Sequence, residues 1–390
     1  MRGSLIKRGD RTYAIVVDLP RRQNGKRNQS WTTFHGTRKQ AEAELARTLL
    51  RLSSGIATGD DRITMAEVVE DHWKPWARNR ASAKTFERWE DMIRRFILPA
   101  FSETSLGKLT PAMIQRTYLR WQESGGYKGS PLAGQTVLHH HRLLFHVLHY
   151  AVRLQVLSRN VAELVEPPKV ERREMTALDE TQAVRLIRSM VGTPMEVPVL
   201  LAIATGLRRG EVCGLKWTDI DFEAAILAVR RSLEETRAGI RFKDPKALSS
   251  RRTIALEPEL IEALQSHKAR QAKLRRSLGS RWNDVGVVFP DPVKSDGSPW
   301  RPDRFFESFR YYARKSDVPR VRFHDLRHSH ATHLLRAGVH LKVASARLGH
   351  STTKLTADTY SHVLSGMDRD ASAMVGRRLR EAAENLLANR

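Results

Sequence analysis

The chain has 390 residues, a formal net charge of +24 and one cysteine. That length exceeds what a single hydrophobic core usually organises, and the lone Cys213 excludes an internal disulfide and fits a reducing, cytoplasmic compartment. No stretch is long and apolar enough for a membrane anchor, and the positive charge favours a polyanion, leaving DNA, ribosomal RNA and acidic membrane surfaces open as partners.

The first 58 residues predict a small three-stranded sheet followed by a helix. Thr12–Asp18 and Trp31–Phe34 are rich in β-branched and aromatic residues, and a short strand around Leu5 would complete the sheet. Thr37 and Gln40 have the spacing of a capping box at a helix start. We therefore place a first, basic domain at residues 1–58.

A second domain, residues 63–166, is predicted to be helical. Apolar residues recur at intervals of three and four in Met65–Trp73, Thr85–Ile97 and Val137–Leu154. The triplet His139–His141 on the last of these segments is interpreted as a polar helix face. Pro167 and Pro168 then predict a stiff, extended connector.

The remainder, residues 174–390, is predicted to be an α+β domain with a small sheet and a C-terminal tail helix at Ala371–Leu387. The strands are Ile226–Val229 and Arg252–Leu256, separated by a polar loop that contains Lys243 and Lys246. The fold class is thus multidomain and mainly α.

Four segments of this last domain carry chemistry. Arg208 comes two residues after Gly206 and precedes Glu211 by three residues, and His324 and Arg327 lie three apart on one helical face. His350 follows a glycine, and Tyr360 comes ten residues later. Planar cationic donors and an oxygen nucleophile are what phosphoryl transfer without a metal needs.

Each residue also has an ordinary explanation when taken alone. Arg208 could be salt-bridged to Glu211, and a single tyrosine is usually a packing residue. A metal site at His324 and His328, with His330 and His333 nearby, is disfavoured because no HExxH or CxxC pattern accompanies them. We expect no metal and no cofactor.

The order TGLRRGE, a lysine in a β-loop, HDLRH, LGH and then tyrosine resembles the catalytic domain of the tyrosine recombinases, the lambda-type phage integrase family. The resemblance covers residues 176–363. It implies that Arg208 and Arg327 grip the scissile phosphate and that Tyr360 is the nucleophile that forms a 3′-phosphotyrosyl intermediate. His324 would support proton transfer and contact the phosphate, and His350 would donate a hydrogen bond to it. Glu211 would support Arg208.

The resemblance also implies a lysine that protonates the departing 5′ oxygen. Lys246 is our choice, because relatives commonly have Pro-Lys-Thr in this loop, although Ala247 replaces the threonine here. Lys243 remains the alternative.

Further expectations follow from the family. The helical domain and the catalytic domain would clamp double-stranded DNA, with phosphate contacts predicted at Lys84, Arg88, Arg94 and Arg95. The N-terminal domain resembles the arm-binding domain, which reads separate sites. We expect a homotetramer on DNA, host DNA-bending or directionality factors, a role in a phage or other mobile element, and a cytoplasmic, nucleoid-associated location.

Two other functions use the same residues. A type IB topoisomerase would relax a single duplex by similar chemistry, whereas a catalytically inactive relative would only bind DNA. Joining of two different duplexes separates the first from a recombinase, and a covalent protein–DNA adduct excludes the second.

Overall fold

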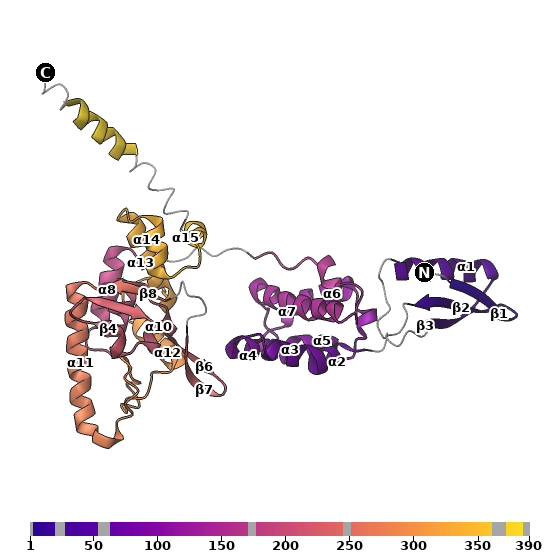
Figure 1. Ribbon diagram of the computed structural model, residues 1–390, viewed down its shortest axis with the longest axis horizontal. Coiled ribbons are helices and arrows are strands. Elements are labelled where there is room, and N and C mark those ends of the chain that lie inside the picture. The colour runs from indigo at the N-terminus through magenta and orange to yellow at the C-terminus, as the bar shows by residue number, and fades with distance from the viewer. Residues whose placement is uncertain are drawn as a thin grey trace. The chain divides into compact units, whose positions relative to one another are not determined.

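The computed structural model describes residues 3–19, 28–53, 63–170, 177–244, 251–360 and 372–384 (Figure 1). The chain divides into two compact units, Met1–Arg172 and Arg173–Arg390. The division falls a few residues after Pro167 and Pro168. The predicted multidomain, mainly helical class with small antiparallel sheets is confirmed.

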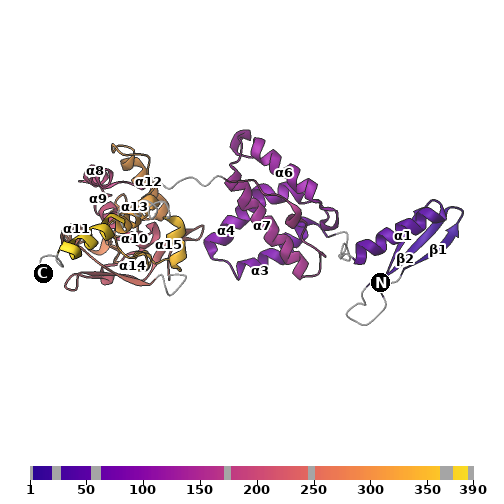
Figure 2. The ribbon, with the colours of Figure 1, turned by 90° about the horizontal axis from the view of Figure 1, so that it is seen from above.

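The N-terminal part of the first unit is an antiparallel sheet of order β1-β2-β3 with one helix. Its elements are β1 (Gly3–Gly9), β2 (Thr12–Leu19), β3 (Asn28–His35) and α1 (Arg38–Ser53). Ala14–Val17 of the central strand are buried because they pair on both sides and α1 packs on β1 and β2 (Figure 2). Thr37 donates its backbone N–H to Gln40 Oε1 at 2.9 Å, and Gln40 returns its own to Thr37 Oγ1.

The rest of the first unit is helical around an aromatic core. Trp73 and Tyr118 are fully buried in it. A π-helical turn, η1, continues α2 into α3, and another, η2, continues α4 into α5. The elements are α2 (Met65–Glu67), η1 (Val68–Trp73), α3 (Lys74–Arg78), α4 (Ala83–Met92), η2 (Ile93–Ile97), α5 (Leu98–Phe101), η3 (Leu106–Lys108), α6 (Pro111–Ser124), η4 (Tyr127–Gly129), α7 (Gly134–Arg153) and η5 (Val161–Leu164).

The second unit packs helices around two small sheets. Its helices are α8 (Glu180–Met190), α9 (Glu196–Thr205), α10 (Arg209–Gly214), η6 (Trp217–Asp219), α11 (Pro258–Leu278), η8 (Gly279–Arg281), α12 (Pro302–Ala313), α13 (Phe323–Arg336), α14 (Leu341–Leu348) and α15 (Thr353–Thr359). Its strands are β4 (Ile220–Asp221), β5 (Ile226–Val229), β6 (Ser232–Thr236), β7 (Gly239–Lys243) and β8 (Arg252–Ala255).

The sheet differs from the sequence prediction in one respect. β5 and β8 pair as expected, with Ile226 opposite Ala255, in a sheet of order β4-β5-β8. The interval between them is not only a loop, because β6 and β7 form a separate hairpin that ends at Lys243. Charged residues such as Glu234 and Arg241 weaken the apolar pattern by which strands are predicted. In the structure these two side chains form an ion pair across the hairpin.

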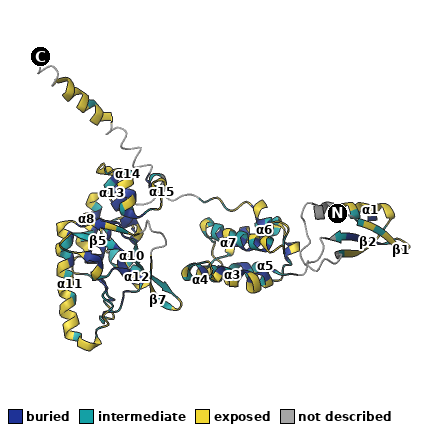
Figure 3. Ribbon diagram, in the orientation of Figure 1, coloured by how far each residue is buried: buried dark blue, intermediate teal, exposed yellow. Residues whose placement is uncertain are grey.

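The buried residues of each unit lie inside, and the outer helices show exposed faces (Figure 3). In the second unit, Phe323 and Leu326 of α13 pack against the core that also contains Phe305 and Phe309. Residues 372–384 form a largely exposed helix within the predicted tail helix. Among the described residues, no helix combines the length and apolarity that crossing a membrane requires.

Candidate active site

Arg327 is the buried centre of the candidate site. It lies on α13 and is 2% exposed. Its guanidinium donates to the carbonyl oxygens of Gly206, at 2.8 Å, and Leu348, at 2.5 Å. A guanidinium has five N–H donors in a fixed plane. Arg327 therefore joins the ends of α9 and α14 and keeps further donors for an anion.

Two glycines make these helix ends possible. Gly206 ends α9 at φ 68° and Gly349 ends α14 at φ 67°, in the left-handed region that L side chains rarely adopt. A Cβ would also lie 2.7 Å from the His330 ring at Gly206, and 2.9 Å from Arg252 Nη1 at Gly349. The glycines of the TGLR and LGH segments thus form sharp turns that Arg208 follows after two residues and His350 after one.

Glu211 holds two arginines beside Arg327. Arg208 donates Nη1 to Glu211 Oε1 at 2.9 Å and Nη2 to the carbonyl of Gly349 at 3.1 Å. Arg252, at the start of β8, donates to both carboxylate oxygens, at 3.1 and 2.9 Å. Although burial opposes ionisation of Glu211, the hydrogen bond and charge of Arg252 lower its pKa below the ordinary value. The carboxylate therefore stays charged and orients Arg208.

Arg252 is a site residue that the sequence analysis missed. Its side chain is 6% exposed, and its Nε donates to the carbonyl of Arg347 at 2.7 Å. The available signal was its position directly after the lysine-containing loop, at the start of a strand.

Three histidines and Tyr360 complete the cluster. His324 and His328 face each other on α13, with ring centroids 4.8 Å apart. Tyr360 follows α15, is 1% exposed, and has its hydroxyl 2.8 Å from His328 Nδ1. The Nδ1 atom of His350 lies 2.7 Å from the Thr356 hydroxyl. His328 is a second residue that the sequence analysis did not place in the site.

Burial and positive charge keep these imidazoles neutral. Burial, followed by the charge of Arg327, lowers the pKa of His324, and the same two effects lower that of His350 to about 4. Burial and His324 lower the pKa of His328 to about 4. Burial raises the pKa of Tyr360 to about 12, although Arg327 opposes this shift. The nucleophile candidate is thus protonated when no DNA is bound.

Of the two candidate lysines, Lys246 lies outside the described residues. Lys243 ends β7 and donates to Glu234 Oε1 at 3.1 Å, which directs its ammonium to the hairpin.

Comparison with known sequences shows the family of the chain. A sequence model described as the phage integrase family matches residues 175–366, and one described as the phage integrase N-terminal SAM-like domain matches residues 65–122. The chain belongs to the phage integrase family. It is a tyrosine recombinase, an enzyme that cleaves and rejoins DNA strands in site-specific recombination. The topoisomerase and inactive-relative alternatives are not favoured.

Individual relatives span most of the recombinase chain. The tyrosine recombinase XerC-like protein of Caldanaerobacter subterraneus subsp. tengcongensis is 28% identical, over 92% of this chain and 94% of its own. The Tn1549 transposon integrase in complex with transposon right end DNA has the same fold, with a TM-score of 0.64, 20% identity and coverage of 79% of this chain and 100% of that chain. A lambda integrase tetramer bound to a Holliday junction gives a TM-score of 0.54 at 19% identity, covering 90% of this chain and 96% of that chain.

The predicted DNA contacts of the recombinase lie on one helical segment of the first unit. Lys84 and Arg88 are exposed on α4, and Arg94 and Arg95 are exposed on η2. Lys84 and Arg88 line a cavity of about 450 Å³ together with Trp89, Arg142 and His139. Arg94 instead donates to Asp91 at 2.8 Å. Lys84 and Arg88 thus share a basic hollow, and Arg94 has a local partner.

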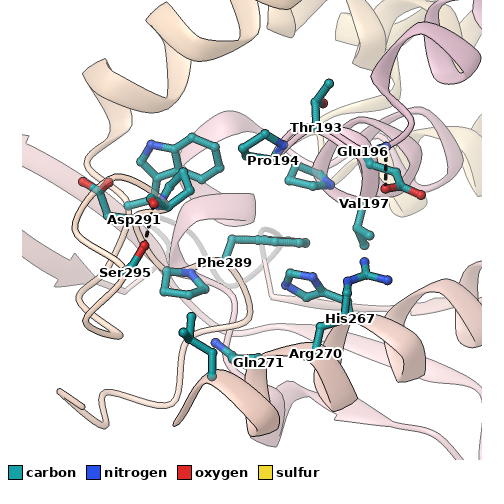
Figure 4. A pocket seen from close by; sticks show the side chains of 16 residues that line it. Thr193, Pro194, Glu196, Val197, His267, Arg270, Gln271, Phe289, Asp291 and Ser295 are labelled. Atoms are coloured by element: carbon teal, nitrogen blue, oxygen red, sulfur yellow. Dashed lines mark hydrogen bonds between the residues drawn. The ribbon is translucent and has the colours of Figure 1, made fainter. Parts of the chain in front are cut away.

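A larger cavity of the recombinase, about 560 Å³, lies elsewhere in the second unit (Figure 4). It is bounded by the start of α9, by α11 around His267 and Gln271, and by the segment around Phe289 and Trp300. None of the predicted catalytic residues lines it. Among the described residues, no group of three or more His, Cys, Asp or Glu side chains is arranged to hold a metal ion.

Proposed function

We propose that Arg208, Arg327, His324 and His350 bind the scissile DNA phosphate and that Tyr360 attacks it. The observation that carries this proposal is the convergence of both arginines on the turn at Leu348–Gly349, with His350 next in the chain. The charge of Arg327 also acts on both His350 and Tyr360. Fixed guanidinium donors stabilise the charge that develops as phosphorus gains a fifth oxygen.

The reaction exchanges one phosphodiester for another. The Tyr360 oxygen forms a bond to phosphorus, the bond to the 5′ oxygen breaks, and a 3′-phosphotyrosyl link and a 5′-hydroxyl result. Because the two esters are of similar energy, a 5′-hydroxyl from another strand can reverse the step on a new partner without ATP. Positioned arginines supply the charge stabilisation that Mg²⁺ provides in many other phosphoryl transfers.

Lys246 would donate the proton to the departing 5′ oxygen. Its alternative, Lys243, is held by Glu234, and both side chains of this pair are partly buried. That pairing favours Lys246, because it holds the Lys243 ammonium on the hairpin.

The first unit would supply DNA binding. Lys84 and Arg88 are proposed to contact phosphates together with Arg94 and Arg95, and the β1-β2-β3 domain is proposed to bind arm sites. On the sheet, the Arg8 guanidinium lies 5.4 Å from the ring centroid of the half-exposed Trp31, which presents a cation and an aromatic surface together. We place domain limits at residues 1–58, 63–166 and 174–390. Two tethered modules raise the effective concentration for distant sites.

The working assembly is proposed to be a homotetramer on two double-stranded DNA sites. The related lambda integrase is a tetramer on a Holliday junction, and the related Tn1549 integrase is bound to transposon end DNA. These relatives support a role in integrating or excising a phage or other mobile element. Host DNA-bending or directionality factors and a cytoplasmic, nucleoid-associated location complete the proposal.

The decisive experiment uses nicked duplexes from candidate attachment sites. We expect wild-type protein to form an SDS-stable adduct whose peptide map places the DNA on Tyr360, and Tyr360→Phe to form none. The Tyr311→Phe variant, which alters an exposed tyrosine of α12, is the matched control and should form the adduct normally. An adduct that survives in Tyr360→Phe would contradict the assignment of the nucleophile.

A further inference from the structure

We infer that His328 is a catalytic residue of this recombinase, which accepts the proton of the Tyr360 hydroxyl as its oxygen attacks the phosphate. The inference rests on the proposed role of Tyr360. It begins from the contact of 2.8 Å between His328 Nδ1 and the Tyr360 hydroxyl, which is within the range for proton transfer.

The contact is fixed from both sides. His328 lies in the interior of α13, one residue after Arg327, so the same helical turn orients the phosphate-binding guanidinium and the imidazole. Tyr360 is 1% exposed, and its ring centroid is 5.9 Å from that of His328. Among the described residues, His328 is the side chain that hydrogen-bonds to the Tyr360 hydroxyl. His324 and His350 instead lie against His328 and Thr356 respectively.

The surroundings suit a neutral acceptor. The charged and titratable groups that act on His328 or are acted on by it come from α13, from the residue before it, and from the segments after α14 and α15: Arg322, His324, Asp325, Arg327, His350 and Tyr360. The positive charges among them favour the unprotonated imidazole, which can accept a proton at Nδ1. A bound phosphate adds negative charge nearby and makes the imidazole more basic at the moment of attack.

The step is balanced. As the Tyr360 oxygen bonds to phosphorus its proton moves to His328 Nδ1, while the 5′ oxygen leaves and takes a proton from a separate donor. A general base need not match the basicity of the free phenolate, because the attacking oxygen loses basicity as its bond to phosphorus forms. In the rejoining step, His328 returns the proton to the departing Tyr360 oxygen.

The test measures single-turnover adduct formation on a nicked duplex that the wild-type protein cleaves. We expect His328→Ala and His328→Asn to lower the rate at neutral pH by roughly 10²-fold, the usual scale for general acid–base catalysis. The variants should also gain a steeper dependence on pH, because hydroxide then removes the Tyr360 proton. His333→Gln, which alters the half-buried imidazole near the Leu178 carbonyl on the same helix, is the control and should keep the wild-type rate.

The asparagine variant separates proton transfer from positioning, since its amide accepts a hydrogen bond but not a proton. A wild-type rate and pH profile in His328→Asn would overturn the inference. A duplex with sulfur at the 5′ bridging position adds a second criterion, because a thiolate leaves without needing a proton. We expect sulfur not to restore the His328 variants; restoration would show that His328 acts on the leaving group and would overturn the inference.

These outcomes are distinguishable from a failure of the proposed function. If Tyr360→Phe abolishes the adduct while both His328 variants react normally, Tyr360 is the nucleophile and His328 is not its base. If Tyr360→Phe still forms the adduct, the nucleophile itself is misassigned.

Discussion

Two helices, α7 in the first unit and α13 in the second, carry several histidines each and have different surroundings. On α7, His140 is 2% exposed and stacks on Phe96 with ring centroids 4.2 Å apart, and His146 packs among Trp73, Trp76 and Trp89. On α13, His324 and His328 face each other; Arg327 lies near His324, and the Tyr360 hydroxyl contacts His328.

The comparison teaches that a run of histidines does not define a function until its neighbours are known. The sequence predicts that the triplet His139–His141 forms a polar helix face, but its middle residue is part of an aromatic core. Burial lowers the pKa of His140 to about 4, and burial also lowers that of His328 to about 4. The two sites therefore share a protonation state and differ in the reactive groups beside them.

The largest expected effect tests the chemistry on α13. Replacing Arg327 with Ala should slow adduct formation by roughly 10³-fold, the scale seen when a charge-stabilising arginine is removed from phosphoryl transfer. His149→Ala, at an exposed histidine of α7, should change the rate by less than about twofold, within the range for surface substitutions. An equal loss of rate in both variants, with unchanged circular dichroism, would contradict the proposal that α13 is catalytic and α7 is not.

The second effect is the loss of stability when the buried Glu211 carboxylate is removed. Glu211→Gln removes the carboxylate that forms ion pairs with both Arg208 and Arg252. The substitution should lower the free energy of unfolding of the second unit by about 3 kcal/mol. Amide hydrogen exchange of α10 and β8 under mild denaturant measures this loss. The exposed pair of Glu307 and Arg310 provides the control, and Glu307→Gln should cost less than about 1 kcal/mol.

The third effect is the pH dependence of the stability that His140 gives to α7. Burial, His139 and Arg88 lower the pKa of folded His140 to about 4, from about 6.5 for an unperturbed histidine. The unfolded chain therefore binds the proton more readily between these pH values. Stability from neutral His140 is therefore complete above about pH 6.5 and is lost as pH falls towards 4. We expect a loss of roughly 3 kcal/mol in the protection of α7 from amide exchange.

His140→Phe should reduce this acid sensitivity, because its ring can stack on Phe96 without titrating. His140 Nδ1 is buried without a hydrogen-bond partner among the described residues, so the substitution leaves no new donor or acceptor unsatisfied there. An unchanged acid response would assign the sensitivity to other α7 histidines.

The smallest effect concerns the basic hollow beside α7. Lys84→Ala and Arg88→Ala should each weaken DNA binding several-fold at moderate salt and lower the slope of log affinity against log salt by about 1. Arg94→Ala should have a smaller effect, since Arg94 is paired with Asp91. Fluorescence anisotropy at several salt concentrations measures the slopes, and equal slopes for all three would contradict the distinction.

Much of this protein is determined by its sequence alone. The capping pair Thr37 and Gln40, the pairing of Ile226–Val229 with the strand that begins at Arg252, and the helical segments follow from local pattern, because hydrogen bonding and apolar periodicity act over a few residues. The order and spacing of Arg208, Arg327, His350 and Tyr360 likewise indicate a single site, and their roles remain predictions.

Only the tertiary structure determined which groups touch. Arg252 joins Glu211 across 41 residues, and His328 meets Tyr360 across 32, and no local rule links such pairs. The same holds for His140, whose neighbours Phe96 and Trp121 come from other helices. Proton transfer and charge pairing act over a few ångströms in space, so they depend on how distant segments pack rather than on the order of residues along the chain.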